Sequence, residues 1–206
     1  MLSDSLAAFL RAGDADPLYL YPMVNAAETL IMLGRLDEAW KENESAASIE
    51  PDNLGVLKRR AWILYLKGRM DEAEQVLQYA SSRVEKPEYS QLEFIHGWIL
   101  SRRGAHEQAR ALLRRLEAMP VASRSLDVKM WLAEGWALEN QPSRSIPVLR
   151  KLAKVHPNYP WFLVDPNLQS LRTNAEYQAL LQGLKLAWEN NRAQFKPFAQ
   201  VIPANY

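Results

Sequence analysis

The feature that most constrains this chain is a turn sequence that occurs twice. The stretches LGRLDEAW and LKGRMDEAE place Gly34 and Gly68 at an interval of 34 residues. Gly104 follows 36 residues later, and Asn140 follows after another 36. Glycine and asparagine most readily adopt the left-handed backbone conformation that closes a helix. An interval longer than an ordinary helix therefore indicates a repeated structural unit.

Each turn residue is flanked by two small side chains that are always twelve residues apart. These pairs are Ala27 and Ala39, Ala61 and Ala73, Gly97 and Ala109, and Ala133 and Ser145. Two antiparallel helices can cross closely where neither has a bulky side chain. Apolar residues recur at helical spacing on both sides of each turn, and a proline lies near the end of each unit. The sequence thus predicts four helical hairpins in series.

A helical hairpin of this length, with small residues at the crossing and a terminal proline, resembles the tetratricopeptide repeat (TPR). The resemblance extends over residues 20–157, in units of about 20–53, 54–87, 90–122 and 126–157. It implies an all-α fold, a right-handed α-solenoid of about four TPR hairpins. Such arrays need a capping helix at each end, because a terminal repeat otherwise exposes its apolar face.

The two ends of the chain provide candidate capping helices. Residues 1–19 predict an N-terminal helix, capped by Ser3 or Asp4, that covers the first repeat with Leu6, Phe9 and Leu10. Residues 158–206 predict an aromatic, proline-rich connector, a capping helix and an irregular tail, FKPFAQVIPANY. Thr173 and Glu176 stand in capping-box register before that helix. Its apolar face would consist of Tyr177, Leu180, Leu181, Leu184 and Trp188.

A second resemblance concerns the segment DPNLQSLRTNAEYQALLQGL, residues 165–184. It is similar to the segment that closes TPR regions of bacterial winged-helix transcriptional activators, adenylyl cyclases and serine/threonine kinases. The resemblance implies a bacterial regulatory context. Because no DNA-binding or kinase domain precedes the repeats, we expect either a solo member of this group or a fragment of a longer chain.

Composition excludes several classes of site and location. The chain has no cysteine, which excludes disulfides and thiolate zinc sites. No apolar run reaches the roughly 18 residues of a membrane span, so membrane insertion is not expected. The N-terminus lacks a basic leader and a long apolar core, so the predicted location is cytoplasmic. A periplasmic location is the alternative if the region belongs to a longer membrane-anchored chain.

Charge is unevenly distributed although the net charge is +1. Residues 1–57 contain 3 basic and 10 acidic side chains, whereas residues 58–115 contain 12 basic and 7 acidic ones. This polarity can orient a partner or favour self-association; solvated helix faces are the alternative explanation. The arginine-rich stretch SRRGAHEQARALLRRL lacks interleaved aromatic residues, so direct nucleic-acid binding is not expected.

Catalytic, metal and cofactor sites are not predicted. The three histidines fall in different units without shared ligand spacing, and no glycine-rich phosphate loop is present. The paired carboxylates Asp37-Glu38 and Asp71-Glu72 lie in first turns of predicted helices, where they complement the helix dipole. We therefore predict a protein that is not an enzyme and needs no cofactor or metal.

The first helix of each TPR hairpin lines a concave groove, and projecting these helices predicts the groove's side chains. The predicted partner-binding set is Tyr21, Val24, Glu28, Lys58, Arg59, Trp62, Tyr65, Phe94, Trp98, Arg102, Met130 and Glu134. Aromatic and arginine side chains are the types enriched in binding hot spots. The alternative is that the tryptophans wedge adjacent repeats together. A clamp for chaperone tails is disfavoured, because Glu28 replaces the asparagine of the first repeat and Gln91 and Ile95 replace basic groups of the third.

The functional prediction is a non-enzymatic scaffold or adaptor that binds a segment of another protein in an aromatic concave groove. A bacterial regulatory system is its expected setting. The alternative is a sensory or regulatory region of a transcriptional activator or kinase-like protein, acting by self-association as a homo-oligomer or by binding a small ligand.

Overall fold

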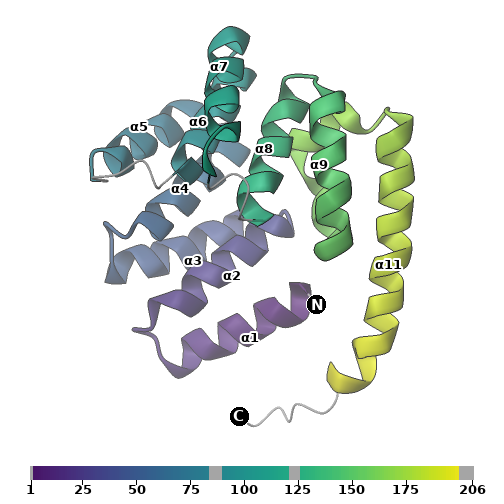
Figure 1. The fold of residues 1–206 in the computed structure, drawn as a ribbon. Coiled ribbons are helices and arrows are strands. Elements are labelled where there is room, and N and C mark those ends of the chain that lie inside the picture. The colour runs from purple at the N-terminus through teal and green to yellow at the C-terminus, as the bar shows by residue number, and fades with distance from the viewer. Residues whose placement is uncertain (1, 84–89, 121–125, 200–206) are drawn as a thin grey trace.

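The structure, a computed structural model, describes residues 2–83, 90–120 and 126–199. These residues form helices and no strand. Four antiparallel pairs follow one another, namely α2 (Leu20–Met32) with α3 (Leu36–Ile49), α4 (Leu54–Leu66) with α5 (Met70–Ser81), α6 (Ser90–Arg102) with α7 (His106–Glu117), and α8 (Leu126–Leu138) with α9 (Pro142–Val155). The pairs stack into an array, which confirms the predicted all-α solenoid of hairpins (Figure 1).

The four hairpin turns have one geometry, which explains the repeated sequence. Gly34, Gly68 and Gly104 have φ angles of 73°, 76° and 78°, and Asn140 has a φ of 52°. At the first turn the Gly34 N–H donates to the Ile31 carbonyl, and the next N–H donates to the Leu30 carbonyl. The same two bonds recur at the other three turns. This is the Schellman arrangement, whose left-handed residue is most often glycine.

Small residues let the two helices of each hairpin approach. All six alanines of the predicted crossing pairs have no exposed surface. In the fourth hairpin the Ser145 hydroxyl donates a hydrogen bond of 2.7 Å to the Ala133 carbonyl, twelve residues earlier. The interval of twelve therefore corresponds to direct contact between the helices of a pair.

A helix covers each end of the array. Helix α1 (Leu2–Ala15) packs against α2, and α11 (Ala175–Ala199) lies along α9 (Figure 1). Leu6 is buried, but Leu10 is 37% exposed, so its predicted covering role is wrong. Ser3 and Asp4 lie inside α1, which begins before them, and not at its N-cap.

The segment after the fourth hairpin is more helical than predicted. The predicted aromatic, proline-rich connector contains a short helix, α10 (Tyr159–Val164), and a 3₁₀-helix, η2 (Pro166–Leu171). Asn174, and not Thr173, caps α11: its side-chain oxygen accepts from the N–H groups of Glu176 and Tyr177 at 2.9 and 3.2 Å. The predicted irregular tail is also wrong up to Ala199, where α11 ends; the remaining tail residues lie outside the described part of the chain.

The length and apolarity of the helices bear on membrane insertion. Within residues 2–83, 90–120 and 126–199, none of the helices is both long and apolar enough to cross a bilayer.

Candidate functional site

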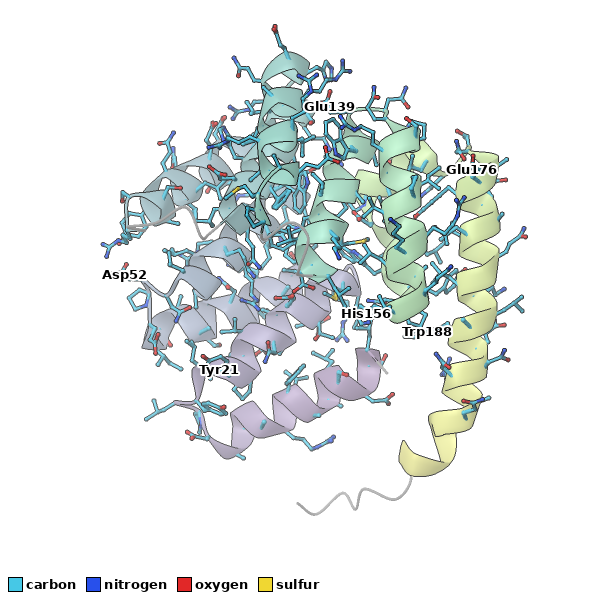
Figure 2. The ribbon with its side chains drawn as sticks, in the orientation of Figure 1. Tyr21, Asp52, Glu139, His156, Glu176 and Trp188 are labelled. Carbon is cyan, nitrogen blue, oxygen red and sulfur yellow. The ribbon has the colours of Figure 1, made fainter. Side chains whose placement is uncertain are left out.

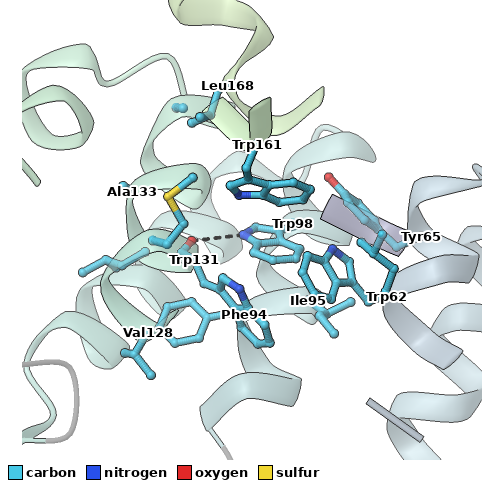
Figure 3. Close-up of a cluster of buried hydrophobic side chains, with 14 of the residues drawn as sticks. Trp62, Tyr65, Phe94, Ile95, Trp98, Val128, Trp131, Ala133, Trp161 and Leu168 are labelled. Carbon is cyan, nitrogen blue, oxygen red and sulfur yellow. Dashed lines mark hydrogen bonds between the residues drawn. The ribbon is translucent and has the colours of Figure 1, made fainter. Parts of the chain in front are cut away.

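The inner face of the array, formed by α2, α4, α6 and α8, is filled by a cluster of four tryptophans. Trp62, Trp98 and Trp131 come from α4, α6 and α8, and Trp161 comes from α10 (Figure 3). The ring centroid of Trp62 lies 6.3 Å from that of Trp98, 5.3 Å from that of Trp131 and 5.7 Å from that of Trp161. The last two pairs meet edge to face, an arrangement that the quadrupole of aromatic rings favours.

The cluster is also tied together by hydrogen bonding and by further rings. The Trp98 indole N–H donates to the Trp131 carbonyl at 3.2 Å (Figure 3). Phe94 contacts Trp131 edge to face, and Tyr65 contacts Trp98 at a centroid distance of 5.6 Å. Because these rings pack on one another across three hairpins, they form part of the core.

The predicted groove residues therefore divide into three groups. Eight are buried: Val24, Arg59, Trp62, Tyr65, Phe94, Trp98, Met130 and Glu134. Two are partly exposed, namely Glu28 and Lys58, and two are exposed, namely Tyr21 and Arg102. The expectation of an open aromatic groove is wrong for Trp62 and Trp98, which are 1% and 0% exposed. They wedge adjacent repeats together, which is the alternative that the sequence left open.

The physical reason is that the connector folds back over the inner face. Helix α10 contacts α2, and η2 packs against α8. Trp161 and Phe162 of α10 and Leu168 and Leu171 of η2 are all buried. Sequence reasoning missed these residues and Trp131; the signal was the stretch NYPWFLVDPNL, whose apolar and aromatic content is unusual for a solvent-exposed connector.

A buried polar network fixes η2 to the inner face. The Tyr65 hydroxyl donates to Oδ1 of Asn167 at 2.5 Å, and the Arg102 Nε–H donates to the Tyr65 oxygen at 3.2 Å. Asn167 also donates from Nδ2 to Oε2 of Glu134 at 3.4 Å. Burial, partly offset by Arg102, raises the pKa of Tyr65, so that this hydroxyl remains a donor.

Two buried carboxyl groups complete this network. Glu134 of α8 and Asp165, which caps η2, have no exposed surface and interact with each other. Burial, followed by the neighbouring Asp165, raises the pKa of Glu134 well above its ordinary value. Burial raises the pKa of Asp165 to about 6, although Glu134, Asn167 and Arg102 oppose the shift. The pair therefore retains a proton that a surface carboxylate would lose.

Charged residues of the predicted set pair with one another or with neighbours. Arg59 donates to Oε2 of Glu28, joining α4 to α2. The Lys58 ammonium donates to Oε1 of Gln91 at 2.8 Å and lies 5.3 Å from the ring centroid of Trp131. Tyr21 points into solvent at the edge of α2 and is 67% exposed (Figure 2). Lys58 and Arg59 of the predicted set are thus engaged within the fold.

A pocket of about 50 Å³, here called the residual pocket, lies among the described residues of the inner face beside the connector. Three residues of the predicted set line it, namely Glu28, Trp62 and Met130. The other lining residues are Met32, Leu126, Asp127, Trp131, Leu152, His156, Asn158, Trp161 and Phe162. In the part of the chain that the structure describes, no group of three or more histidine or carboxylate side chains is arranged to hold a metal ion. The pocket's chemistry is therefore that of aromatic walls with a few polar groups.

Comparisons with known proteins bear on the fold alone. No protein-family model matches the sequence, and no curated protein matches it. The solved structure of TTC0263, a thermophilic TPR protein of Thermus thermophilus, is similar, with a TM-score of 0.53 and 18% identity over 88% of this chain and 89% of that one.

PilW, a widely conserved type IV pilus biogenesis factor, is similar with a TM-score of 0.51 and 20% identity, over 88% of each chain. Identities this low relate the folds and not the functions. With the four Schellman turns and the four close crossings, these structures settle the architecture. The chain therefore has the tetratricopeptide-repeat fold.

Proposed function

We propose that this protein is a non-enzymatic protein–protein interaction scaffold that binds a partner segment at the residual pocket of the inner face. The observation that supports this proposal is the position of the pocket. Helices α2, α4 and α8 each contribute a residue of the predicted set to its lining, where the connector leaves the inner face uncovered. Concave apolar pockets with a few polar groups are the usual binding sites on folded domains.

The proposal places the partner differently from an open groove. The connector already covers the cluster of tryptophans, so the partner segment would contact the rim of the pocket, where Leu126 is 43% exposed. The closing segment that resembles bacterial regulatory proteins supports a bacterial regulatory setting. Removing Trp62 or Trp98 would not test this proposal, because both are core residues and their loss would destabilise the fold.

Site-specific photo-crosslinking tests the proposal without disturbing the core. A photoreactive phenylalanine derivative replaces Leu126 at the pocket rim or, as the control, Tyr79 on α5; both native side chains are 43% exposed. Each variant is irradiated in lysate of the source organism, and crosslinked proteins are identified by mass spectrometry. We expect a partner from position 126 and none from position 79. Crosslinks only from position 79, or only to a second copy of the chain, would contradict the proposal.

A further inference from the structure

The size of the residual pocket limits what it can hold. A single water needs about 10–15 Å³ on this scale, and a cavity that accepts a benzene ring has about 150 Å³. A pocket of about 50 Å³ is therefore too small for an aromatic ring or a cofactor. It has room for a group of a few heavy atoms, such as the end of one side chain.

The polar atoms of the lining are mainly hydrogen-bond acceptors. Asn158 is 6% exposed, and its Oδ1 has no hydrogen-bond partner. Arg59 occupies Oε2 of Glu28, and no described residue donates to Oε1. Asp127 lines the same pocket and forms no ion pair within the described ranges, although its charge interacts at longer range with Lys58 and Arg59. A guest that enters therefore meets two carboxylates and a buried, unpartnered amide oxygen.

The remaining walls are aromatic rings, which attract cations. Trp62, Trp131 and Trp161 line the pocket, and Trp131 and Trp161 each meet Trp62 edge to face. A cation over an indole face is stabilised by the ring quadrupole, most strongly for tryptophan. Lys58 already lies over Trp131 in this way, with its ammonium turned toward Gln91.

The balance of donors and acceptors distinguishes a cationic guest from a neutral one. The buried polar atoms of the lining that lack a partner are the indole N–H of Trp62 and Oδ1 of Asn158. The carboxylates of Glu28 and Asp127 add acceptors, and the exposed imidazole of His156 can donate or accept. Arginine and lysine side chains offer donors only, whereas a neutral amide or urea offers a donor and an acceptor. The acidic excess of residues 1–57, which include α2, would attract a basic segment.

We infer that the residual pocket is a binding site for the cationic head group of an arginine or lysine side chain. This inference rests on the proposed function, since the side chain would belong to the partner segment. The head group lies against the indole of Trp62, donates to Oδ1 of Asn158, and is balanced chiefly by the carboxylate of Asp127, since Arg59 already pairs with Glu28.

Nuclear magnetic resonance titration with a matched pair of small probes tests the inference. Nα-acetyl-arginine amide is added to the full chain, and the indole N–H resonance of Trp62 is followed. We expect a saturable shift with a dissociation constant in the millimolar range. Nα-acetyl-citrulline amide has the same shape but no charge, and we expect it to give no saturable shift. Equal responses to the two probes, or no response to the arginine probe, would overturn the inference.

Two variants, each of which neutralises one carboxylate, test whether the arginine probe binds in the residual pocket. Asp127→Asn should weaken binding of the arginine probe by about twofold to fivefold, as expected for a partly exposed charge pair. Glu107→Gln is the control, because Glu107 is also exposed and is likewise the second residue of its helix, α7. It should leave the affinity unchanged. Equal weakening by both variants would mean a general charge effect and would overturn the assignment to this pocket.

The probe titration and the crosslinking experiment fail independently. If position 126 captures a partner but the arginine probe does not bind, the proposed function stands and this assignment of the pocket is wrong. If the probe binds as expected but no partner is captured, the cation site stands and the scaffold proposal loses its support.

Discussion

The indole of Trp161 stands edge-on against the indole of Trp62, with ring centroids 5.7 Å apart and ring planes at 84°. One ring belongs to the second hairpin and the other to the connector that follows the fourth. This contact brings the connector onto the inner face and replaces the open aromatic groove that a bare array of hairpins would present.

Replacing Trp161 by alanine should lower the free energy of unfolding by about 3–5 kcal/mol, because it removes a 5%-exposed indole from the core. Urea denaturation followed by circular dichroism measures the change. Leu163→Ala is the control on the same helix, and we expect less than about 1 kcal/mol there, since Leu163 is 44% exposed. Similar losses from both variants would show that the connector does not depend on the aromatic contact.

The hydroxyl of Ser145 ties the two helices of the fourth hairpin through the Ala133 carbonyl. Ser145→Ala keeps the side chain small but removes this bond, and we expect a loss of about 0.5–1.5 kcal/mol in unfolding free energy. Ser143→Ala, at an exposed position in the first turn of α9, provides the matched control. An unchanged midpoint for Ser145→Ala would mean that close packing alone holds this crossing.

Alanine substitutions at two glycines distinguish the effect of backbone conformation on stability from the effect of steric crowding. Gly68 has a φ of 76° and Gly183 lies within α11, and an added Cβ would meet no atom within 4 Å at either position. Gly68→Ala should destabilise the protein by about 1–2 kcal/mol through left-handed strain alone. Gly183→Ala should stabilise it by about 0.5–1 kcal/mol through helix propensity. Thermal denaturation compares the two, and shifts of the same sign would contradict this explanation.

The carboxyl pair of Glu134 and Asp165 predicts a pH dependence of stability. Both pKa values are raised in the folded protein, mainly by burial, so the folded state binds a proton that the unfolded chain releases. Stability contributed by this proton is present below the ordinary pKa of aspartate, 3.8, and is lost as pH rises through about 6 and beyond. Arg102, Arg172 and the indole of Trp161 face the pair and limit the effect.

Glu134→Gln removes one titrating group and should flatten this part of the pH profile, with the largest gain in stability at alkaline pH. Urea midpoints between pH 4 and pH 9 measure it. Glu139→Gln is the contrasting variant: burial opposes its ionisation, but hydrogen bonds from His106, Ser101 and Arg110 lower its pKa. Its loss should therefore cost stability at neutral pH. If the two variants changed the urea midpoint in the same way across this pH range, the explanation that Glu134 and Asp165 share a proton would be wrong.

The fold could be predicted because its determinants are local and periodic. Gly34 and its three counterparts set the turns, and the small residues at intervals of twelve set the crossings. Both patterns are properties of neighbouring residues along the chain, so the sequence displays them directly. The buried face of α11, with Tyr177 at 0% and Leu184 at 3% exposure, followed in the same way from helical spacing.

The site could not be predicted to the same degree, because it depends on contacts between distant segments. Helical projection placed Trp62 and Trp98 on the inner face but could not show that Trp161 would cover them. Likewise, Glu134 meets Asp165 only because η2, which Asp165 caps, packs against α8. Periodicity identifies the face on which a residue lies, whereas its exposure depends on what folds against that face.

The connector also changes how the array can come apart. An open stack of hairpins is held by contacts between neighbours, so it can lose its end units one at a time. Here Asn158 lies against Met32 of the first hairpin, Asn167 is bonded to Tyr65 of the second, and η2 packs on α8 of the fourth. The segment thus ties the first, second and fourth hairpins to one another, and we expect these hairpins to unfold in one cooperative transition instead of by stepwise loss of end units.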